Sequence, residues 1–269
     1  MGFLDRFRQR KDDDSTVAGP DPLPTGPAPS ATAPQPTPTA SVLVPAAEPT
    51  SRADQLEELE DSAREMVAPA FETRERIEES LVEQYVLDDD YDLTEDDVRE
   101  VLRRVWQERL DEEATWADEG DYPRLEAAFA ALDGTGIVAR MNFACCQTCG
   151  HAEIDDERVD GSRGYVFFHQ QDTERLAPGG TDLFLAFGGF DFAAGVDPSL
   201  VERARAGDED AKQAAIVASE ELVGAEVAGA LRSEGLTVEW DGTCAQRIRV
   251  TGLDWRKRLP VGPTAPGLG

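Results

Sequence analysis

The stretches Gly164-Tyr-Val-Phe-Phe-His169 and Asp182-Leu-Phe-Leu-Ala-Phe187 decide the fold of this chain. Both are short and carry apolar side chains at nearly every position, which predicts two central strands that are buried on both faces of a sheet. A third strand is expected over Ile137–Cys145, where apolar side chains alternate with polar ones such as Arg140 and Asn142. These three strands should form the first part of one sheet.

The residues after these strands predict one long helix and a final pair of strands. Apolar positions recur with helical spacing over Asp208–Ser233, and Gly235 is well placed as the left-handed residue after the helix. Strands are expected over Leu236–Trp240 and Arg247–Thr251, with Asp241-Gly242 in the turn between them. The element order β-β-β-α-β-β behind N-terminal helices predicts an α+β fold with a mainly antiparallel five-strand sheet.

An acidic helical region is expected over residues 51–134, followed by the α+β domain over residues 135–258. Apolar side chains in the first region recur at three- and four-residue steps, and Thr94 with Asp97 resembles a capping box. Residues 51–124 hold 26 acidic and 9 basic side chains, a net charge of −17. We expect the basic zone near the C-terminus to face these acids; it comprises Arg247, Arg249, Arg256, Lys257 and Arg258.

The two ends of the chain are expected to lie outside the folded part. Residues 1–50 predict a disordered Pro/Ala-rich tail, because ten prolines fall between Pro20 and Pro49 and few side chains there can be buried. Its short basic start, residues 1–11, could make a weak membrane-surface contact, but a frayed start is favoured because so short a helix is marginal in water. Residues 259–269 predict a flexible C-terminal tail.

Charge and hydropathy restrict the classes of function. The 26 basic and 55 acidic residues give a net charge of −29, which repels nucleic-acid phosphates and favours a protein partner. No apolar run reaches the roughly 18 residues that a transmembrane helix needs, and the N-terminus lacks the apolar core of a secretory signal. We therefore expect a cytoplasmic protein, with its 4 cysteines reduced rather than paired in disulfides.

Three of the cysteines lie together in Phe143-Ala-Cys-Cys-Gln-Thr-Cys-Gly-His151. Continued strand alternation would point Cys145 into the core and leave Cys146 and Cys149 as a C-x-x-C pair. Two thiolates at that spacing can share one zinc ion, so the pattern predicts a zinc knuckle that needs further ligands from loops and strand ends. The candidate zinc ligands are Cys146, Cys149, His169 and Cys244.

Other interpretations of the cysteines stay open. In a small thiol-dependent enzyme, Cys149 or Cys146 would be the nucleophile, with His169 as its base and Asp172 orienting the base. A redox pair would place its first cysteine at a helix start, which the residues after Cys149 do not resemble. Alternatively, Cys145 and Cys149 are small core residues. We expect a non-catalytic binding or regulatory module, with the enzyme as the alternative.

Three strings in the chain resemble an actinobacterial family, domain of unknown function 6891. They are Cys145-Cys-Gln-Thr-Cys-Gly-His-Ala-Glu153, Gly164-Tyr-Val-Phe-Phe-His-Gln-Gln-Asp-Thr-Glu174 and Val238-Glu-Trp-Asp-Gly242. The resemblance covers roughly Leu56 to Arg258 and excludes residues 1–50. It implies that the strings around the cysteines and around His169 belong to one domain, and it carries over no activity.

Overall fold

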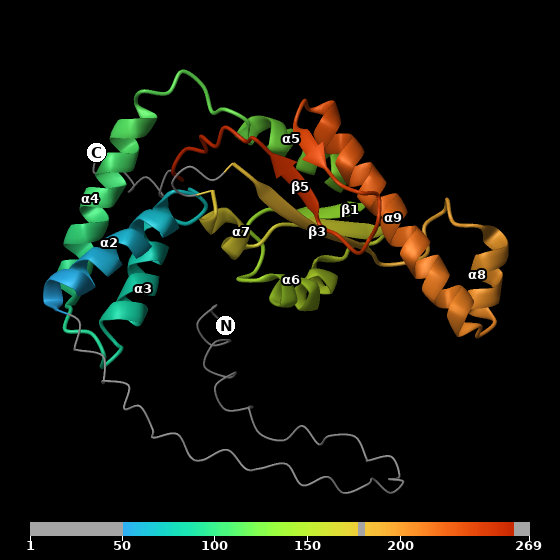
Figure 1. Cartoon of the computed structure of the whole chain (residues 1–269), viewed down its shortest axis with the longest axis horizontal. Helices are drawn as coiled ribbons and strands as arrows, with labels where there is room; N and C mark the ends of the chain where they lie inside the picture. The colour runs from blue at the N-terminus through green and yellow to red at the C-terminus, as the bar shows by residue number, and fades with distance from the viewer. Residues whose placement is uncertain (1–50, 177–180, 261–269) are drawn as a thin grey trace, which may run out of the picture. The chain divides into compact units, whose positions relative to one another are not determined.

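Residues 51–176 and 181–260 are described by the computed structural model of the protein, and they form eight α-helices and one five-stranded sheet (Figure 1). The predicted α+β class is confirmed. The expected N-terminal tail lies outside the described residues, as does the expected C-terminal tail from residue 261 onward. In the described part of the chain, no helix is long and apolar enough to cross a membrane.

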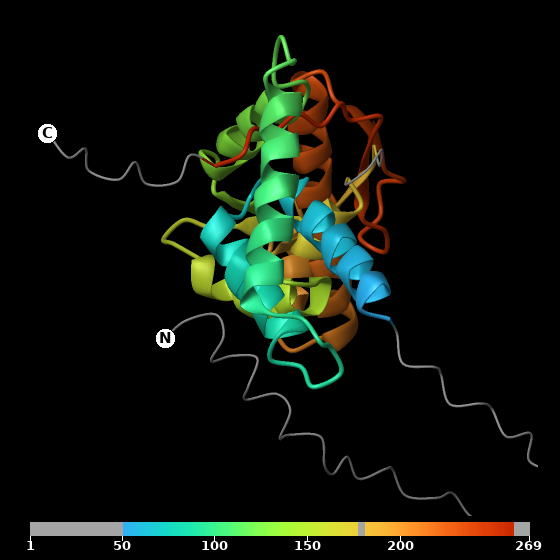
Figure 2. The ribbon, with the colours of Figure 1, turned by 90° about the vertical axis from the view of Figure 1, so that its left-hand side faces the viewer.

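The first three helices form a bundle in which α4 (Glu95–Glu113) packs against both α2 (Arg52–Val67) and α3 (Arg74–Tyr85) (Figure 2). The predicted capping box is present: the Thr94 side chain accepts from the backbone N–H of Asp97, whose carboxylate accepts from Thr94 N–H at 2.8 Å. Apolar stripes of the three helices meet in one core, which includes Leu59, Ala63, Ile77, Leu81, Val98 and Leu102.

The C-terminal end of the described chain returns to this bundle. Leu259 is buried in the core of the bundle, at an exposed fraction of 7%. Its backbone N–H donates to Glu113 Oε1 at 2.7 Å, and Arg109 of the same helix donates to the carbonyl of Lys257 at 3.0 Å. The bundle is therefore built from both ends of the described chain.

The sheet consists of β1 (Ile137–Arg140), β2 (Gly164–Phe167), β3 (Leu183–Gly189), β4 (Thr237–Glu239) and β5 (Ile248–Thr251). Its spatial order is β1-β2-β3-β5-β4. The β1–β2 pair is parallel and the other three neighbouring pairs are antiparallel, so the sheet is mixed but mainly antiparallel, as predicted.

Helices cover the two faces of the sheet unequally. The long helix α9 (Glu209–Ser233) and α5 (Tyr122–Asp133) share a large apolar core with β2 side chains such as Val166. The opposite face, which carries Phe167, is covered by the short helix α6 (Gln147–Glu153) (Figure 1). Three further short elements complete the fold: η1 (Ile154–Glu157), α7 (Gln170–Glu174) and α8 (Pro198–Arg205).

The first strand is five residues shorter than predicted. It ends at Arg140 because Asn142 (φ 51°) and Ala144 (φ 57°) adopt the left-handed region, which no strand backbone occupies. Strand alternation therefore does not reach Cys145, and the prediction that it points into the core is wrong. The residues after Cys146 form α6 with Cys146 as its N-cap, so the expectation that no helix starts at the cysteines is wrong.

Candidate metal centre

Three thiols meet where the loop after β1 enters α6. Cys149 Sγ lies 3.4 Å from Cys145 Sγ and 3.5 Å from Cys146 Sγ, and all three sulfurs are within 4.8 Å of one another. Cys149 is buried, and the other two side chains are half-buried. Sulfurs around a tetrahedral zinc ion with Zn–S bonds of about 2.3 Å are about 3.8 Å apart. The three thiols could therefore enclose such an ion with little movement.

The local backbone explains how the thiols are gathered. Positive φ at Ala144 (57°) turns the chain sharply, and Cys146 then becomes the N-cap residue of α6. Cys149 follows three residues later on the same side of the first helical turn. Gly150 lets the helix lie flat on the sheet, because a Cβ at this position would come within 2.3 Å of the Phe167 ring.

The surroundings of Cys145 and Cys146 shift the pKa values of the two thiols in opposite directions. Hydrogen bonds from the backbone N–H of Cys149, and more weakly from that of Thr148, hold the pKa of the Cys146 thiol below its usual value. Burial raises the pKa of Cys145 to about 12. Cys146 is therefore the first of the two to ionise, whereas a metal ion would have to displace the proton of Cys145.

A buried histidine–carboxylate pair lies just beyond β2. His169 Nε2 is 3.0 Å from Asp172 Oδ2, and the two side chains are 6% and 0% exposed. Arg247 donates to the same carboxylate oxygen. Burial lowers the pKa of His169 despite the opposing charge of Asp172. A neutral ring that donates Nε2–H to Asp172 has its lone pair at Nδ1, and this buried nitrogen has no hydrogen-bond partner.

Helix α6 lies against the face of β2 that carries Tyr165 and Phe167. His151 Nδ1 lies 3.0 Å from Tyr165 Oη, while Gly150 sits directly over the Phe167 ring. Gln170 N–H donates to the Ala144 carbonyl at 3.1 Å, so the loop that leads into α6, with its thiols, lies beside the residues that follow Phe167.

His169 follows β2 in the segment that is hydrogen-bonded to the thiol loop. Its backbone is still extended (φ −108°, ψ 171°), so alternation puts it on the same face as Phe167. The chain segments also touch, since Gln171 N–H donates to the Cys145 carbonyl at 3.4 Å. In the described residues, however, the cluster within 4.8 Å contains the three sulfurs alone.

Cys244 lies outside the sulfur cluster. Its half-buried thiol hydrogen-bonds with Glu220 of α9, and burial is the main cause that raises its pKa. His151, from the same sequence string as the thiols, faces Tyr165 rather than the sulfurs. The structure therefore unites three of the four cysteines, including Cys145, whose membership the sequence interpretation missed. The signal in the sequence was the C-C-x-x-C spacing itself.

Only part of the basic zone near the C-terminus contacts the acidic region. Arg256 and Arg258 contact acids that follow α4, at 3.3 Å from Asp118 and 3.5 Å from Glu119, as expected. Arg249 instead pairs with Asp182 and Glu239 of the α+β domain. Arg247 pairs with buried Asp172, which the charge pattern did not reveal. Arg247 thereby belongs to the surroundings of the candidate metal centre.

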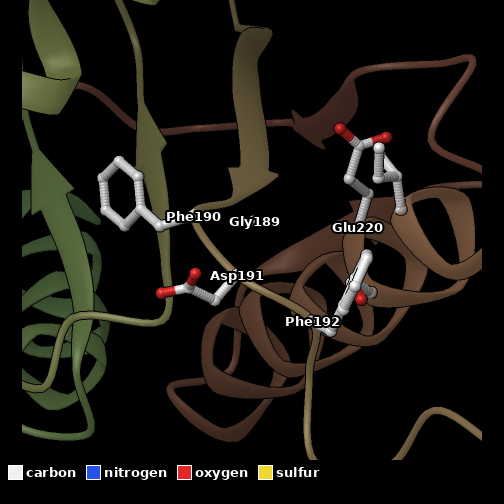
Figure 3. A pocket seen from close by; sticks show the side chains of 7 residues that line it. Gly189, Phe190, Asp191, Phe192 and Glu220 are labelled. Carbon is white, nitrogen blue, oxygen red and sulfur yellow. The ribbon is translucent and has the colours of Figure 1, made fainter. Parts of the chain in front are cut away.

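A separate cleft lies between the end of β3 and α9, with Glu220 across from Phe190 and Asp191 (Figure 3). It has a volume of about 310 Å³. Asp191 is already paired with Arg158, whose guanidinium lies over the Phe190 ring at 5.1 Å. Among the described residues, the carboxylates of this cleft belong to no group of three metal-binding side chains.

The fold and the site together define an α+β domain with a cluster of three thiols at the start of a sheet-covering helix. The model of domain of unknown function 6891 (DUF6891) matches residues 52–259, and the chain therefore belongs to this family. The match contains the thiol cluster, His169 and Asp172, and it confirms the resemblance found in the sequence. No curated protein and no solved structure matches the chain.

Proposed function

We propose that this domain is a metal-binding module in which the thiolates of Cys145, Cys146 and Cys149 hold one zinc ion. The observation that carries the proposal is the approach of all three sulfurs to within 4.8 Å of one another. Thiolate ligands select zinc and other soft cations over magnesium or calcium. The bound ion would tie the loop after β1 to α6, and it would serve structure or regulation rather than catalysis.

His169 is the fourth ligand in this proposal. Its Nδ1 is buried, holds the lone pair and lacks a partner, while Asp172 accepts from Nε2 on the far side of the ring. A carboxylate behind the ring is the usual support of a metal-bound histidine. Because Nδ1 lies outside the sulfur cluster, metal binding would draw the thiol loop toward the ring. A closed set of four protein ligands leaves no position for substrate, which supports a non-catalytic role.

Metal content of the whole protein, purified without added metal or chelator and then loaded with zinc, tests the proposal. We expect one zinc per chain by elemental analysis, and at least a tenfold loss of affinity in Cys146→Ser and in Cys149→Ser. Cys244→Ser is the matched control and should keep full affinity. A chain that takes up no zinc, or that loses it equally in Cys244→Ser, would contradict the thiol cluster as the metal site.

Cobalt substitution tests the fourth ligand separately. Cobalt bound to three thiolates and one imidazole gives visible bands that shift when the imidazole is lost. We expect this shift, together with weaker binding, in His169→Asn. His151→Asn is the matched control because that ring hydrogen-bonds with Tyr165 instead of facing the sulfurs. An unchanged cobalt spectrum in His169→Asn would remove His169 from the ligand set and leave the thiols in place.

A thiol-dependent enzyme is the second candidate, and the buried His169–Asp172 pair favours it. A histidine held by a carboxylate is also how a catalytic base is oriented toward a nucleophilic thiol. Cys149 or Cys146 would then transfer its proton to His169 Nδ1. Rapid alkylation of Cys149 near neutral pH, slowed in His169→Asn and unaffected by added zinc, would support the enzyme over the metal module.

The acidic surface of the helical bundle suggests the kind of partner. Exposed carboxylates of α2 to α4 outnumber their basic neighbours, so a regulatory contact would favour a basic protein surface. Nucleic acid would be repelled by the same charge.

A further inference from the structure

We propose that oxidation regulates the metal site: a hydroperoxide converts Cys149 and one neighbouring thiol into a disulfide, and the zinc ion leaves. This inference rests on the proposed function, since only a loaded site can be emptied. The geometry further assigns Cys149 to every disulfide that can form in the cluster, a role that neither of the other two thiols can take over.

Cys149 is the shared partner in every feasible disulfide of the cluster. Its sulfur is 3.4 Å from that of Cys145 and 3.5 Å from that of Cys146. A disulfide bond of about 2.05 Å requires each gap to close by only about 1.4 Å, which a side-chain rotation provides. The adjacent residues Cys145 and Cys146 cannot bond to each other without severe strain. Cys244 lies outside the cluster.

The pair Cys146–Cys149 combines a disulfide-compatible backbone with one thiol that an oxidant can reach. The two residues are N-cap and third residue of one helical turn, where Cα atoms three positions apart are about 5 Å from each other, within the disulfide range. Cys146 is half-buried, whereas Cys149 is only 7% exposed. A small hydroperoxide would therefore reach Cys146, or the likewise half-buried Cys145, before Cys149, which would act from inside the protein.

The oxidation balances with the hydroperoxide as the two-electron oxidant. The Cys146 sulfur attacks the terminal peroxide oxygen, so that an S–O bond forms, the O–O bond breaks and an alcohol leaves. The Cys149 sulfur then attacks the Cys146 sulfur, the S–S bond forms, the S–O bond breaks and the oxygen leaves as water. Two zinc-bound thiolates, one hydroperoxide and two protons from solvent thus give one disulfide, one alcohol and one water; with hydrogen peroxide, a second water takes the place of the alcohol.

The disulfide removes two of the three thiolates from the site. Cys145 and His169 would remain, and two ligands are too few for a closed structural zinc site. The metal would leave, and the loop after β1 would lose its link to the sheet face under α6. The switch returns to its starting state when a thiol reductant cleaves the disulfide.

Zinc release from the loaded full-length protein tests this proposal. Hydrogen peroxide is added in stepwise equivalents, free zinc is followed with a chromogenic chelator, and disulfides are mapped by mass spectrometry. We expect one zinc released for each Cys149-containing disulfide, and rebinding of zinc after reduction. Cys244→Ser should behave like the unchanged protein.

Single substitutions separate the pairing from the metal. Metal-free Cys145→Ser and Cys146→Ser should each still form one disulfide through Cys149, while Cys149→Ser should form none within the cluster. A Cys149→Ser chain that forms an intramolecular disulfide at the same rate overturns the assignment. If the zinc-loaded protein forms the disulfide but keeps its zinc, the proposed regulation is wrong, while the zinc site itself stands. A protein that holds no zinc before peroxide is added refutes the proposed function, and the release with it.

Discussion

Replacement of Gly150 by alanine tests whether the close contact between α6 and the sheet holds the thiol loop in place. A Cβ built at this position would lie 2.3 Å from Phe167 Cε2 and 2.5 Å from Cζ, well inside van der Waals contact. Phe167 is fully buried, and its ring also packs edge-on against Phe143 and His151, so it has no free space to enter. The helix itself must therefore move.

Two opposing effects set the magnitude. Alanine favours a helix over glycine by about 1 kcal/mol, whereas overpacking a buried site costs roughly 1–3 kcal/mol and more where the neighbour is rigid. We expect the clash to dominate, with a net loss of about 1–2 kcal/mol in the free energy of unfolding. Lifted from β2, α6 would also carry Cys149 away from Cys145, 3.4 Å from it, and weaken zinc binding.

Urea unfolding of the metal-free protein measures this change, and a second glycine provides the control. Gly229 lies in α9, is exposed and has no atom within 4 Å of its built Cβ. Gly229→Ala should therefore stabilise the protein, by up to about 1 kcal/mol. Phe167→Leu in the Gly150→Ala background should recover part of the loss. If Gly150→Ala is as stable as Gly229→Ala, the contact between helix and sheet does not position the thiols as we argue.

Two further predictions concern the buried pair beside the thiols. Arg247→Met leaves the Asp172 carboxylate buried without its cationic partner and should lower the free energy of unfolding in urea by about 3 kcal/mol. The double variant Asp172→Asn with Arg247→Met should lose less than Arg247→Met alone. Equal losses would show that the two side chains are not coupled. The pKa of His169 is lower in the folded protein than in the unfolded chain, so the folded state resists protonation of this ring. The neutral ring therefore contributes to stability above the unfolded pKa of about 6.5, and this contribution is lost as pH falls toward the lower folded-state pKa. Unfolding of the metal-free protein between pH 5 and 7 should thus be steeper in pH than unfolding of His169→Asn, and identical slopes would contradict a buried neutral ring.

Periodicity was a good guide wherever the chain obeys one period over many residues. The two continuously apolar central strands and the long helix Glu209–Ser233 lie where their patterns place them, and Thr94 caps its helix as its spacing with Asp97 predicts. These features depend on local chemistry and on burial of one face, both of which can be seen in a single sequence.

The site could be predicted only in part, because its geometry depends on places where the chain leaves the strand and helix periods. Left-handed φ angles at Asn142 and Ala144 end β1 early, and neither residue is a glycine that would have signalled the turn. The seven-residue helix α6 is too short to display an apolar stripe. Pairing of Asp172 with Arg247 joins residues 75 positions apart, which no local pattern encodes.

The return of Leu259 to the bundle core has a consequence for how the chain is made. Synthesis proceeds from the N-terminus, so α2, α3 and α4 leave the ribosome long before the residue that completes their core. Until then, the apolar side chains that Leu259 covers are open to water and to other nascent chains. Removal of residues from Leu259 onward should therefore lower the soluble yield by impairing α2 to α4, although even Glu113, at the end of α4, lies 146 positions before the cut.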